Sequence, residues 1–240
     1  MDTDKVKNQA IDPKMEKFIE DFYLGSSKDL EEFRLLCEKE YIPIIRRETE
    51  SFLKDLLRTV KPVNLLEIGT GAGYSATVFA KTLEDCQIGV DDDYLITTVE
   101  LIEKRVRAAQ KSFVKYNVSG QIKLLEGDAS KVLKTIIKDM DHLPEEELFD
   151  FVFIDCAKSR YMEFFQSALQ ITRSEAIIVC DNVFLGGRTV SDSFIARHRE
   201  KTSTVKMREF VNYLKLFDDH IKTSLFNIGD GLTVSYISKD

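Results

Sequence analysis

Hydrophobic residues recur along this 240-residue chain with two kinds of spacing. Apolar residues at steps of three and four predict amphipathic helices, whereas short apolar runs bounded by turn residues predict buried strands. Helices are expected over residues 13–24, 29–41, 47–60, 74–83, 103–116, 130–140, 159–171 and 205–217. Strands are expected over residues 63–68, 95–101, 121–126, 149–155, 176–181, 221–226 and 232–237.

The order of these elements predicts the fold class. Strands and helices alternate through the middle of the chain, which is typical of a doubly wound α/β sheet with right-handed crossovers. The short segment N-I-G-D-G between the last two strands predicts a hairpin. We therefore expect a Rossmann-like seven-stranded sheet, mostly parallel, with an antiparallel C-terminal hairpin. No linker or repeat divides the chain, so residues 1–240 are expected to form one domain, with extra N-terminal helices over residues 1–60 as a cover.

The stretch L-E-I-G-T-G-A-G-Y-S joins the first strand to the next helix through three glycines. Glycine permits a sharp turn and a close approach of the backbone to a ligand, and the first amides of the helix would point into the same turn. Glu67 precedes the turn, which is a poor position for a dinucleotide pyrophosphate but a suitable one for a cationic ligand. S-adenosylmethionine carries an ammonium and a sulfonium group, so we interpret the turn as a site for this cofactor.

Acidic residues stand at or just after the carboxyl ends of five successive strands. They are Glu67, Glu100, Asp128, Asp155 and Asp181. Ligands of doubly wound sheets bind beyond these strand ends. Any one of the acids could instead cap a helix, but five in succession favour a binding site.

Asp155 and the pair Asp181-Asn182 end two strands that one crossover helix separates, so their side chains are expected to lie side by side. Carboxylate and amide oxygens suit Mg²⁺, Mn²⁺ or Ca²⁺, whereas no His or Cys group has the spacing of a zinc site. Lys158 follows Asp155 by three residues. It is either an exposed lysine or a general base whose pKa a neighbouring cation lowers.

Charge and composition narrow the class of protein. The net charge of −7 disfavours a general nucleic-acid binder. No apolar run reaches membrane-spanning length, and the N-terminus lacks the apolar segment of a signal peptide. The four cysteines form no C-x-x-C pair and are interpreted as reduced thiols of a cytoplasmic protein. We therefore expect neither a nucleic-acid nor a membrane partner.

The chain resembles the cation-dependent class I O-methyltransferases of the caffeoyl-CoA and catechol type. The matching motifs are L-E-I-G-T-G-A-G-Y-S, F-D-F-V-F-I-D-C-A-K-S-R-Y, I-V-C-D-N-V-F-L-G-G and F-N-I-G-D-G-L-T-V, within residues 40–240. The resemblance implies that a divalent cation, most simply Mg²⁺, assists methyl transfer from S-adenosylmethionine to a hydroxyl group. The acceptor would be a small catechol-like or hydroxycinnamoyl-type phenol, and the protein would be a homodimer.

The resemblance also implies roles for individual residues. Lys158 and Asp155 would be catalytic, and Asp155, Asp181 and Asn182 would bind the cation. The cofactor would contact Ile45, Glu67, Gly69, Thr70, Gly71, Gly73, Ser75, Glu100, Asp128, Ala129 and Asp155.

The chain departs from the family pattern at three places. Glu100 lies later after the glycine turn because of the polar stretch 84–93, which is interpreted as an insertion. Ala157 and Leu185 stand where the plant enzymes carry an acid and a tryptophan, so the loop that faces the acceptor is not plant-like.

Three other functions fit the sequence less well. A nicotinamide dehydrogenase would carry G-x-G-x-x-G and an acid about 20 residues further on, but this chain has G-x-G-x-G, and Glu100 follows Gly73 by 27 residues. An RNA methyltransferase is disfavoured by the acidic composition. A non-catalytic cofactor-binding or scaffold protein would be expected to lack the cation ligands or Lys158, and all of them are present.

Overall fold

The computed structural model describes residues 13–23, 27–86, 95–195, 200–216 and 219–239. Most of the polar stretch 84–93, predicted to be an insertion, therefore lies outside the described residues.

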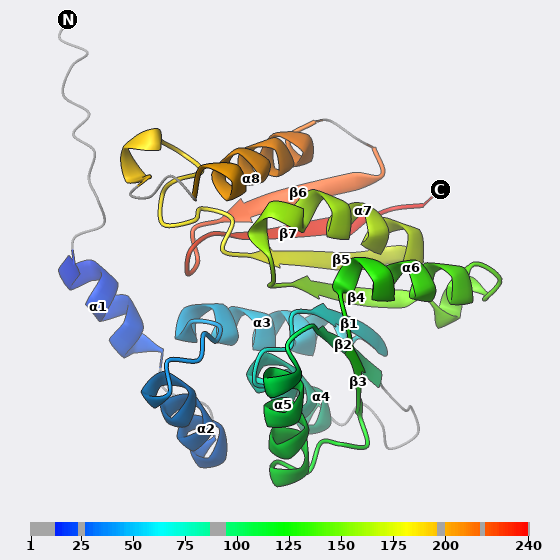
Figure 1. Ribbon diagram of the computed structural model, residues 1–240, viewed down its shortest axis with the longest axis horizontal. Helices are drawn as coiled ribbons and strands as arrows, with labels where there is room; N and C mark the ends of the chain where they lie inside the picture. The colour runs from blue at the N-terminus through cyan, green and yellow to red at the C-terminus, as the bar shows by residue number, and fades with distance from the viewer. Residues whose placement is uncertain (1–12, 24–26, 87–94, 196–199, 217–218, 240) are drawn as a thin grey trace, which may run out of the picture.

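One sheet forms the centre of the described structure, with the strand order β3-β2-β1-β4-β5-β7-β6 (Figure 1). The first five strands of this order pair in parallel, and β7 runs antiparallel to both β5 and β6. The predicted doubly wound sheet with a C-terminal hairpin is therefore confirmed. The strands are β1 (Asn64–Ile68), β2 (Leu95–Glu100), β3 (Ile122–Glu126), β4 (Phe149–Ile154), β5 (Thr172–Asp181), β6 (Ile221–Phe226) and β7 (Leu232–Ile237).

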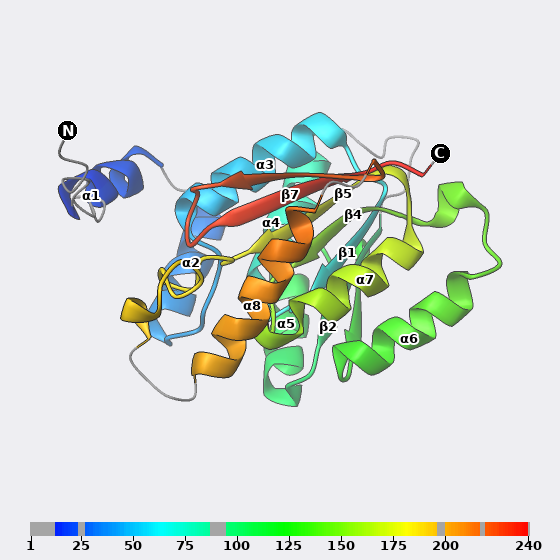
Figure 2. The ribbon, with the colours of Figure 1, turned by 90° about the horizontal axis from the view of Figure 1, so that it is seen from above.

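Helices cover both faces of the sheet (Figure 2). One face carries α2 (Lys28–Lys39), α3 (Arg47–Val60), α4 (Tyr74–Asp85) and α5 (Glu103–Lys115), and the other carries α6 (Ala129–Met140), α7 (Tyr161–Ile171) and α8 (Glu200–Leu214). Helix α1 (Pro13–Phe22) projects from the N-terminal side in Figure 1. The expected helical cover before the first strand is present in α2 and α3.

Two apolar cores lie on opposite sides of the sheet because successive strand residues point to opposite faces. Leu65 and Phe151 belong to the core under α2 to α5, whereas Leu66 and Val152 belong to the core under α6 to α8. Burial on both faces explains why β1 and β4 are mostly apolar along their whole length rather than alternating with polar residues.

Two elements begin earlier than the hydrophobic pattern predicts. Strand β5 starts at Thr172 rather than at residue 176, and α8 starts at Glu200 rather than at residue 205. Both added segments are polar, so they carry no apolar period. In β5 the pairing with β4 is irregular between Phe149 and Phe151, and Glu175 has a φ of 63°. This irregularity marks the polar start of the strand.

Short 3₁₀ turns occur at η1 (Glu145–Glu147), η2 (Lys158–Arg160) and η3 (Asp192–Phe194). The helix predicted to begin at residue 159 therefore starts as η2, and α7 follows from Tyr161. All four cysteines are free thiols. Among the described helices, none combines the length and the apolar character needed to cross a membrane.

Candidate active site

A pocket of ≈ 610 Å³ opens at the carboxyl ends of β1, β2 and β4. Residues from the loop between α2 and α3, from the glycine turn and from the segment after β4 line its walls. This volume falls within the range that small-molecule and cofactor sites occupy. The position is the one at which doubly wound sheets bind their ligands.

The glycine turn at the pocket wall requires glycine for two different reasons. Gly69 has a φ of +111°, and a Cβ atom there would lie 2.1 Å from the carbonyl oxygen of Asp155. Gly73 has a φ of +83° at the N-cap of α4, where a Cβ atom would lie 2.7 Å from the ring of Phe113. Close contact of β1 with the end of β4 therefore depends on Gly69, and packing of α4 on α5 depends on Gly73.

Glu67 lies beneath the pocket and is fully buried. Its two carboxyl oxygens accept hydrogen bonds from the hydroxyls of Ser75 and Thr98. Burial raises the pKa of Glu67 to about 7, although the two hydroxyls oppose this shift. Ser75 and Thr70 line the pocket, whereas Glu67 does not. Glu67 therefore acts on the site indirectly, by holding the Ser75 hydroxyl in place.

Glu100 ends β2 and is 6% exposed at the pocket wall. One of its oxygens accepts the Gly71 N–H at 2.9 Å, and the other accepts the Ile102 N–H at 2.9 Å. These two backbone donors hold the carboxylate beside the glycine turn. Its remaining lone pairs are suited to accept hydrogen bonds from ligand hydroxyl groups.

Asp128 caps α6 by accepting the Ser130 N–H at 2.9 Å, and it also forms an ion pair with Arg160 at 3.2 Å. Arg160 additionally contacts Glu163 at 3.0 Å and lies over the ring of Phe164 at 5.3 Å. Arg160 and Phe164 both line the pocket, and neither was predicted as a site residue. The sequence feature that could have identified Arg160 as a site residue is its position in the same motif as Asp155.

Lys158 is the centre of a polar cluster on the other side of the pocket. Its Nζ atom lies 2.6 Å from Asp155 Oδ1, 2.8 Å from Asn182 Oδ1 and 2.7 Å from the hydroxyl of Tyr161. Asn182 has a φ of 58°, a conformation that asparagine adopts more readily than most residues. Asp155 and Asn182 thus come from different strands and converge on one positive charge.

Asp181 lies behind this cluster and is 1% exposed. Its carboxylate accepts the N–H of Asn182 at 2.7 Å. Burial, together with the nearby charge of Asp155, raises the pKa of Asp181 to about 7, although Lys158 opposes the shift. Within the described part of the chain, no group of three or more His, Cys, Asp or Glu side chains has the arrangement of a metal site.

Tyr161 supports the cluster from below and was not predicted from the sequence. Its hydroxyl accepts from Lys158 and donates toward the carbonyl oxygens of Asp181 at 2.8 Å and Ile154 at 3.1 Å. The ring is fully buried against α8, in an edge contact with Phe210. Tyr161 therefore fixes the Lys158 amine relative to the ends of β4 and β5.

Most of the predicted site residues meet at this pocket. Glu67, Gly73 and Asp181 lie behind its wall and support residues that line it. The predicted residues that line it are Ile45, Gly69, Thr70, Gly71, Ser75, Glu100, Asp128, Ala129, Asp155, Lys158 and Asn182.

Known proteins with similar sequences are methyltransferases. The chain is 30% identical over 142 residues to a catechol O-methyltransferase of Niastella koreensis, an alignment that covers 59% of each chain. It is 24% identical over 210 residues to a caffeoyl-CoA O-methyltransferase of Stellaria longipes, covering 82% of this chain and 83% of the relative.

A solved structure agrees with these sequence matches. A methyltransferase of Podospora anserina, solved with S-adenosylhomocysteine bound, superimposes with a TM-score of 0.79 at 25% identity, over 97% of both chains. The α/β fold predicted from the pattern is thus the fold of known methyltransferases.

A sequence model of a whole family also matches the chain. The O-methyltransferase family model matches residues 23–237, which is most of the chain. The resemblance to the caffeoyl-CoA and catechol type and the predicted enzyme class, an S-adenosylmethionine-dependent O-methyltransferase, are confirmed by these matches. The pocket lies at the strand ends, and the family model matches nearly the whole chain. The chain therefore belongs to the O-methyltransferase family.

Proposed function

We propose that this protein transfers the methyl group of S-adenosylmethionine to a hydroxyl group of a small catechol-like or hydroxycinnamoyl-type phenol, assisted by a divalent cation. The observation that carries the proposal is the Lys158 cluster, in which a cationic amine and oxygen ligands from two strand ends meet beside the glycine turn. The names of the catechol and caffeoyl-CoA relatives support the class of acceptor.

The glycine turn and Glu100 are proposed to bind the cofactor. Glu100 would accept the ribose hydroxyls, since backbone amides already hold its carboxylate at the pocket wall. Ser75 and the turn would contact the methionine part, and Asp128 and Ala129 would lie near the adenine. The same pocket is lined by Lys158, so the reactive end of the cofactor would be bound in the pocket that holds the proposed base.

The oxygen donors fit a hard divalent cation by their chemistry. Asp155 Oδ1 and Asn182 Oδ1 both lie within hydrogen-bond distance of one ammonium group, so they already converge on a single positive charge. A cation near Asp181 would also favour the ionised form of its carboxyl, whose pKa burial raises. A divalent cation held by Asp155, Asp181 and Asn182 would supply Lewis-acid activation of the acceptor hydroxyl.

Lys158 is proposed to act in its uncharged form, which a neighbouring divalent cation would favour, and to receive the proton of the acceptor hydroxyl. Tyr161 and Asn182 hold its amine at the pocket, so the base and the acceptor oxygen are kept in a defined position. The acceptor oxygen would then bond to the methyl carbon of S-adenosylmethionine as the bond from that carbon to sulfur breaks, which would give a methyl ether and S-adenosylhomocysteine. Holding both reactants in that geometry supplies much of the rate.

Chelation tests the cation directly. With small catechols and hydroxycinnamoyl thioesters as acceptors, we expect EDTA to stop turnover and Mg²⁺ or Mn²⁺ to restore it. Asp181→Ala should abolish turnover and still bind S-adenosylhomocysteine, because the cofactor contacts lie elsewhere. The matched control is Asp55→Ala, which removes an exposed carboxylate on α3 that pairs with Arg58. Full turnover in excess chelator would contradict the proposal.

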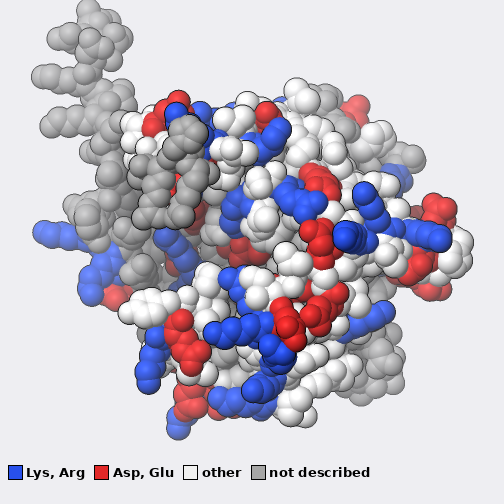
Figure 3. Space-filling model, viewed as in Figure 1, with Lys and Arg blue, Asp and Glu red and all other residues white. Residues whose placement is uncertain are grey.

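A small-molecule acceptor also suits the surface. Figure 3 shows Lys and Arg side chains interspersed with Asp and Glu on the face drawn. A surface on which both signs of charge are mixed, on a protein with a net charge of −7, does not provide the positive potential that attracts nucleic acid. We propose that the protein works in the cytoplasm, where its free thiols would remain reduced.

We further propose that the protein is a homodimer whose contact includes α1. Met15, Phe18 and Phe22 are 55%, 68% and 70% exposed, an apolar surface that is costly to leave in water. Light scattering at micromolar concentration should give a dimer, and the double variant Phe18→Asp with Phe22→Asp should give a monomer. Val114→Asp, at an exposed position of α5, is the control and should remain dimeric. A monomeric wild type would contradict the proposal.

A further inference from the structure

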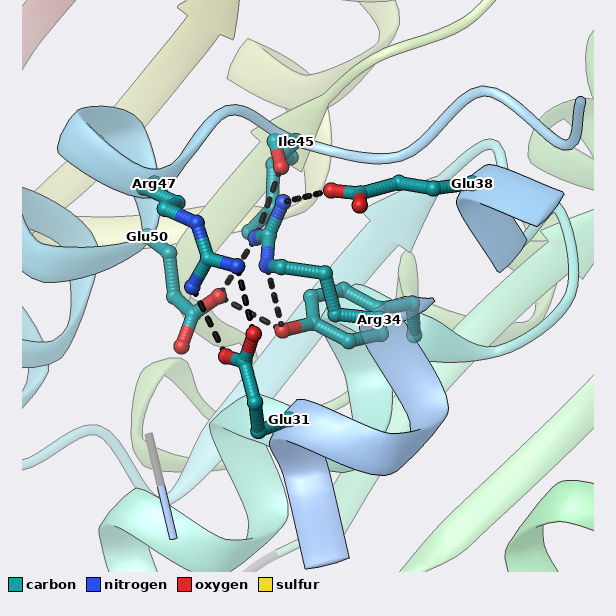
Figure 4. Close-up of polar contacts among 7 residues, drawn as sticks. Glu31, Arg34, Glu38, Ile45, Arg47 and Glu50 are labelled. Atoms are coloured by element: carbon teal, nitrogen blue, oxygen red, sulfur yellow. Dashed lines mark hydrogen bonds and ion pairs between the residues drawn. The ribbon is translucent and has the colours of Figure 1, made fainter. Parts of the chain in front are cut away.

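A buried polar network joins the N-terminal helices to the glycine turn. Arg34 on α2 and Glu50 on α3 form an ion pair at 2.6 Å, with exposures of only 3% and 5%. The hydroxyl of Tyr74, the first residue of α4, donates to the same Glu50 oxygen at 2.7 Å and accepts from Arg34 Nε at 3.2 Å. Each pair of these three residues is therefore directly hydrogen-bonded, and Figure 4 shows the contact between Arg34 and Glu50.

The same guanidinium also holds the loop that forms one wall of the pocket. Arg34 donates to the carbonyl oxygen of Ile45 at 2.9 Å, as Figure 4 shows. Ile45 and the neighbouring residues 42–46 line the pocket, whereas Arg34 and Glu50 are not among its lining residues. One side chain thus links α2, α3, the pocket loop and the start of α4.

The geometry of the guanidinium suits this task. Arginine offers several donors in a fixed plane, so its bonds to Ile45, Glu50 and Tyr74 set their relative positions at once. The guanidinium also lies 4.8 Å from the centre of the Tyr74 ring, in a cation–π contact. Because the network is buried, leaving one of its polar groups without a partner would be costly.

We propose that Arg34, Glu50 and Tyr74 are positioning residues that hold the 42–46 loop against the glycine turn and so preform the cofactor pocket. The inference rests on the proposed cofactor site and adds to it the N-terminal helices. A pocket that is formed only part of the time binds its ligand more weakly in proportion to that fraction. Of the three residues only Tyr74 lines the pocket, so the network would set the affinity for the cofactor chiefly through the position of the loop.

The test is the binding of S-adenosylhomocysteine to Arg34→Met by calorimetry. The Kd is expected to rise about tenfold or more, as for a loop that is in place about a tenth of the time. In turnover, the KM for S-adenosylmethionine should rise while kcat at saturating cofactor is mostly retained, since the reacting groups are untouched. Circular dichroism confirms that the variant is folded.

Tyr74→Phe provides a second variant, because Arg34→Met removes the ion-pair partner of the buried Glu50 carboxylate. The phenylalanine keeps the ring in the core and deletes only the hydroxyl that joins α4 to the network. We expect its Kd to rise about threefold to tenfold, with the same separation of KM from kcat.

Arg47→Met is the matched control. Arg47 on α3 forms a two-bond ion pair with Glu31 on α2, so it joins the same two helices through the same chemistry. Its contact with Glu31 includes neither Tyr74 nor the Ile45 carbonyl, and its Kd should stay within about twofold of the wild type.

Three outcomes would overturn the inference. Folded Arg34→Met and Tyr74→Phe proteins with the wild-type Kd would show that the network does not set affinity. An equal rise in Arg47→Met would assign the effect to general loosening of α2 and α3. A wild type that does not bind S-adenosylhomocysteine would overturn the proposed cofactor site and this inference together, whereas the first two outcomes overturn this inference alone.

Discussion

Replacing Lys158 with methionine is expected to lower kcat by about 10²- to 10⁴-fold, the range that one general base contributes. Methionine keeps much of the length of the side chain but removes the amine that contacts Asp155, Asn182 and Tyr161. The loss should be greatest at low pH, where the acceptor phenol is protonated. The Kd of S-adenosylhomocysteine should change little, because Glu100 and the glycine turn remain in place.

Steady-state kinetics with the catechol or hydroxycinnamoyl thioester that is methylated fastest measures this effect. Lys206→Met is the control, since Lys206 is an exposed lysine on α8 that pairs with Glu209. It should keep the wild-type kcat. A Lys158→Met protein with kcat within about tenfold of the wild type would remove Lys158 from the chemistry.

Gly69→Ala is expected to destabilise the fold by about 3–5 kcal/mol and to abolish cofactor binding. The new Cβ would lie 2.1 Å from the carbonyl oxygen of Asp155, a rigid backbone atom, and the φ of +111° is one that alanine rarely adopts. Relief requires β1 and the end of β4 to separate, which also displaces Asp155 from Asn182. Urea unfolding and calorimetry with S-adenosylhomocysteine measure the two effects.

Gly120→Ala is the matched control for this substitution. A Cβ at Gly120, in the turn before β3, would meet no atom within 4 Å. Its free energy of unfolding should stay within about 0.5 kcal/mol of the wild type. A Gly69→Ala protein as stable as the Gly120→Ala protein would show that the contact of the glycine turn with β4 tolerates a methyl group.

The periodicity of the sequence determined the sheet and most of its helices because their signals are local. The runs that became β1 and β4 are buried on both faces, so most of their residues are hydrophobic, and Asn64, Glu67 and Asp150 are the polar exceptions. The start of β5 at Thr172 was missed, since its first residues are polar and only their pairing beside β4 makes them a strand. A pattern within one segment carries no information about such a partner.

The motifs likewise predicted which residues gather at the strand ends. Parallel strands place their carboxyl ends at one edge, so Asp155 and Asn182 had to lie near each other once the crossover was recognised. A shared edge of the sheet determines that these side chains are close together, but it does not determine how deeply each one is buried. It did not distinguish Asn182, which lines the pocket, from Asp181, which lies buried behind it.

The tertiary structure alone decided the contacts between residues far apart in the chain. The bonds of Tyr161 to the Asp181 carbonyl, of Arg160 to Asp128 and of Arg34 to Tyr74 have no spacing that marks them in advance. The sequence by itself determined the family, the fold and the edge of the sheet that carries the site, because those follow from local periods and contiguous motifs. Which side chains support that site depended on how helices pack across the sheet, because a hydrogen bond joins atoms by distance in space rather than by separation along the chain.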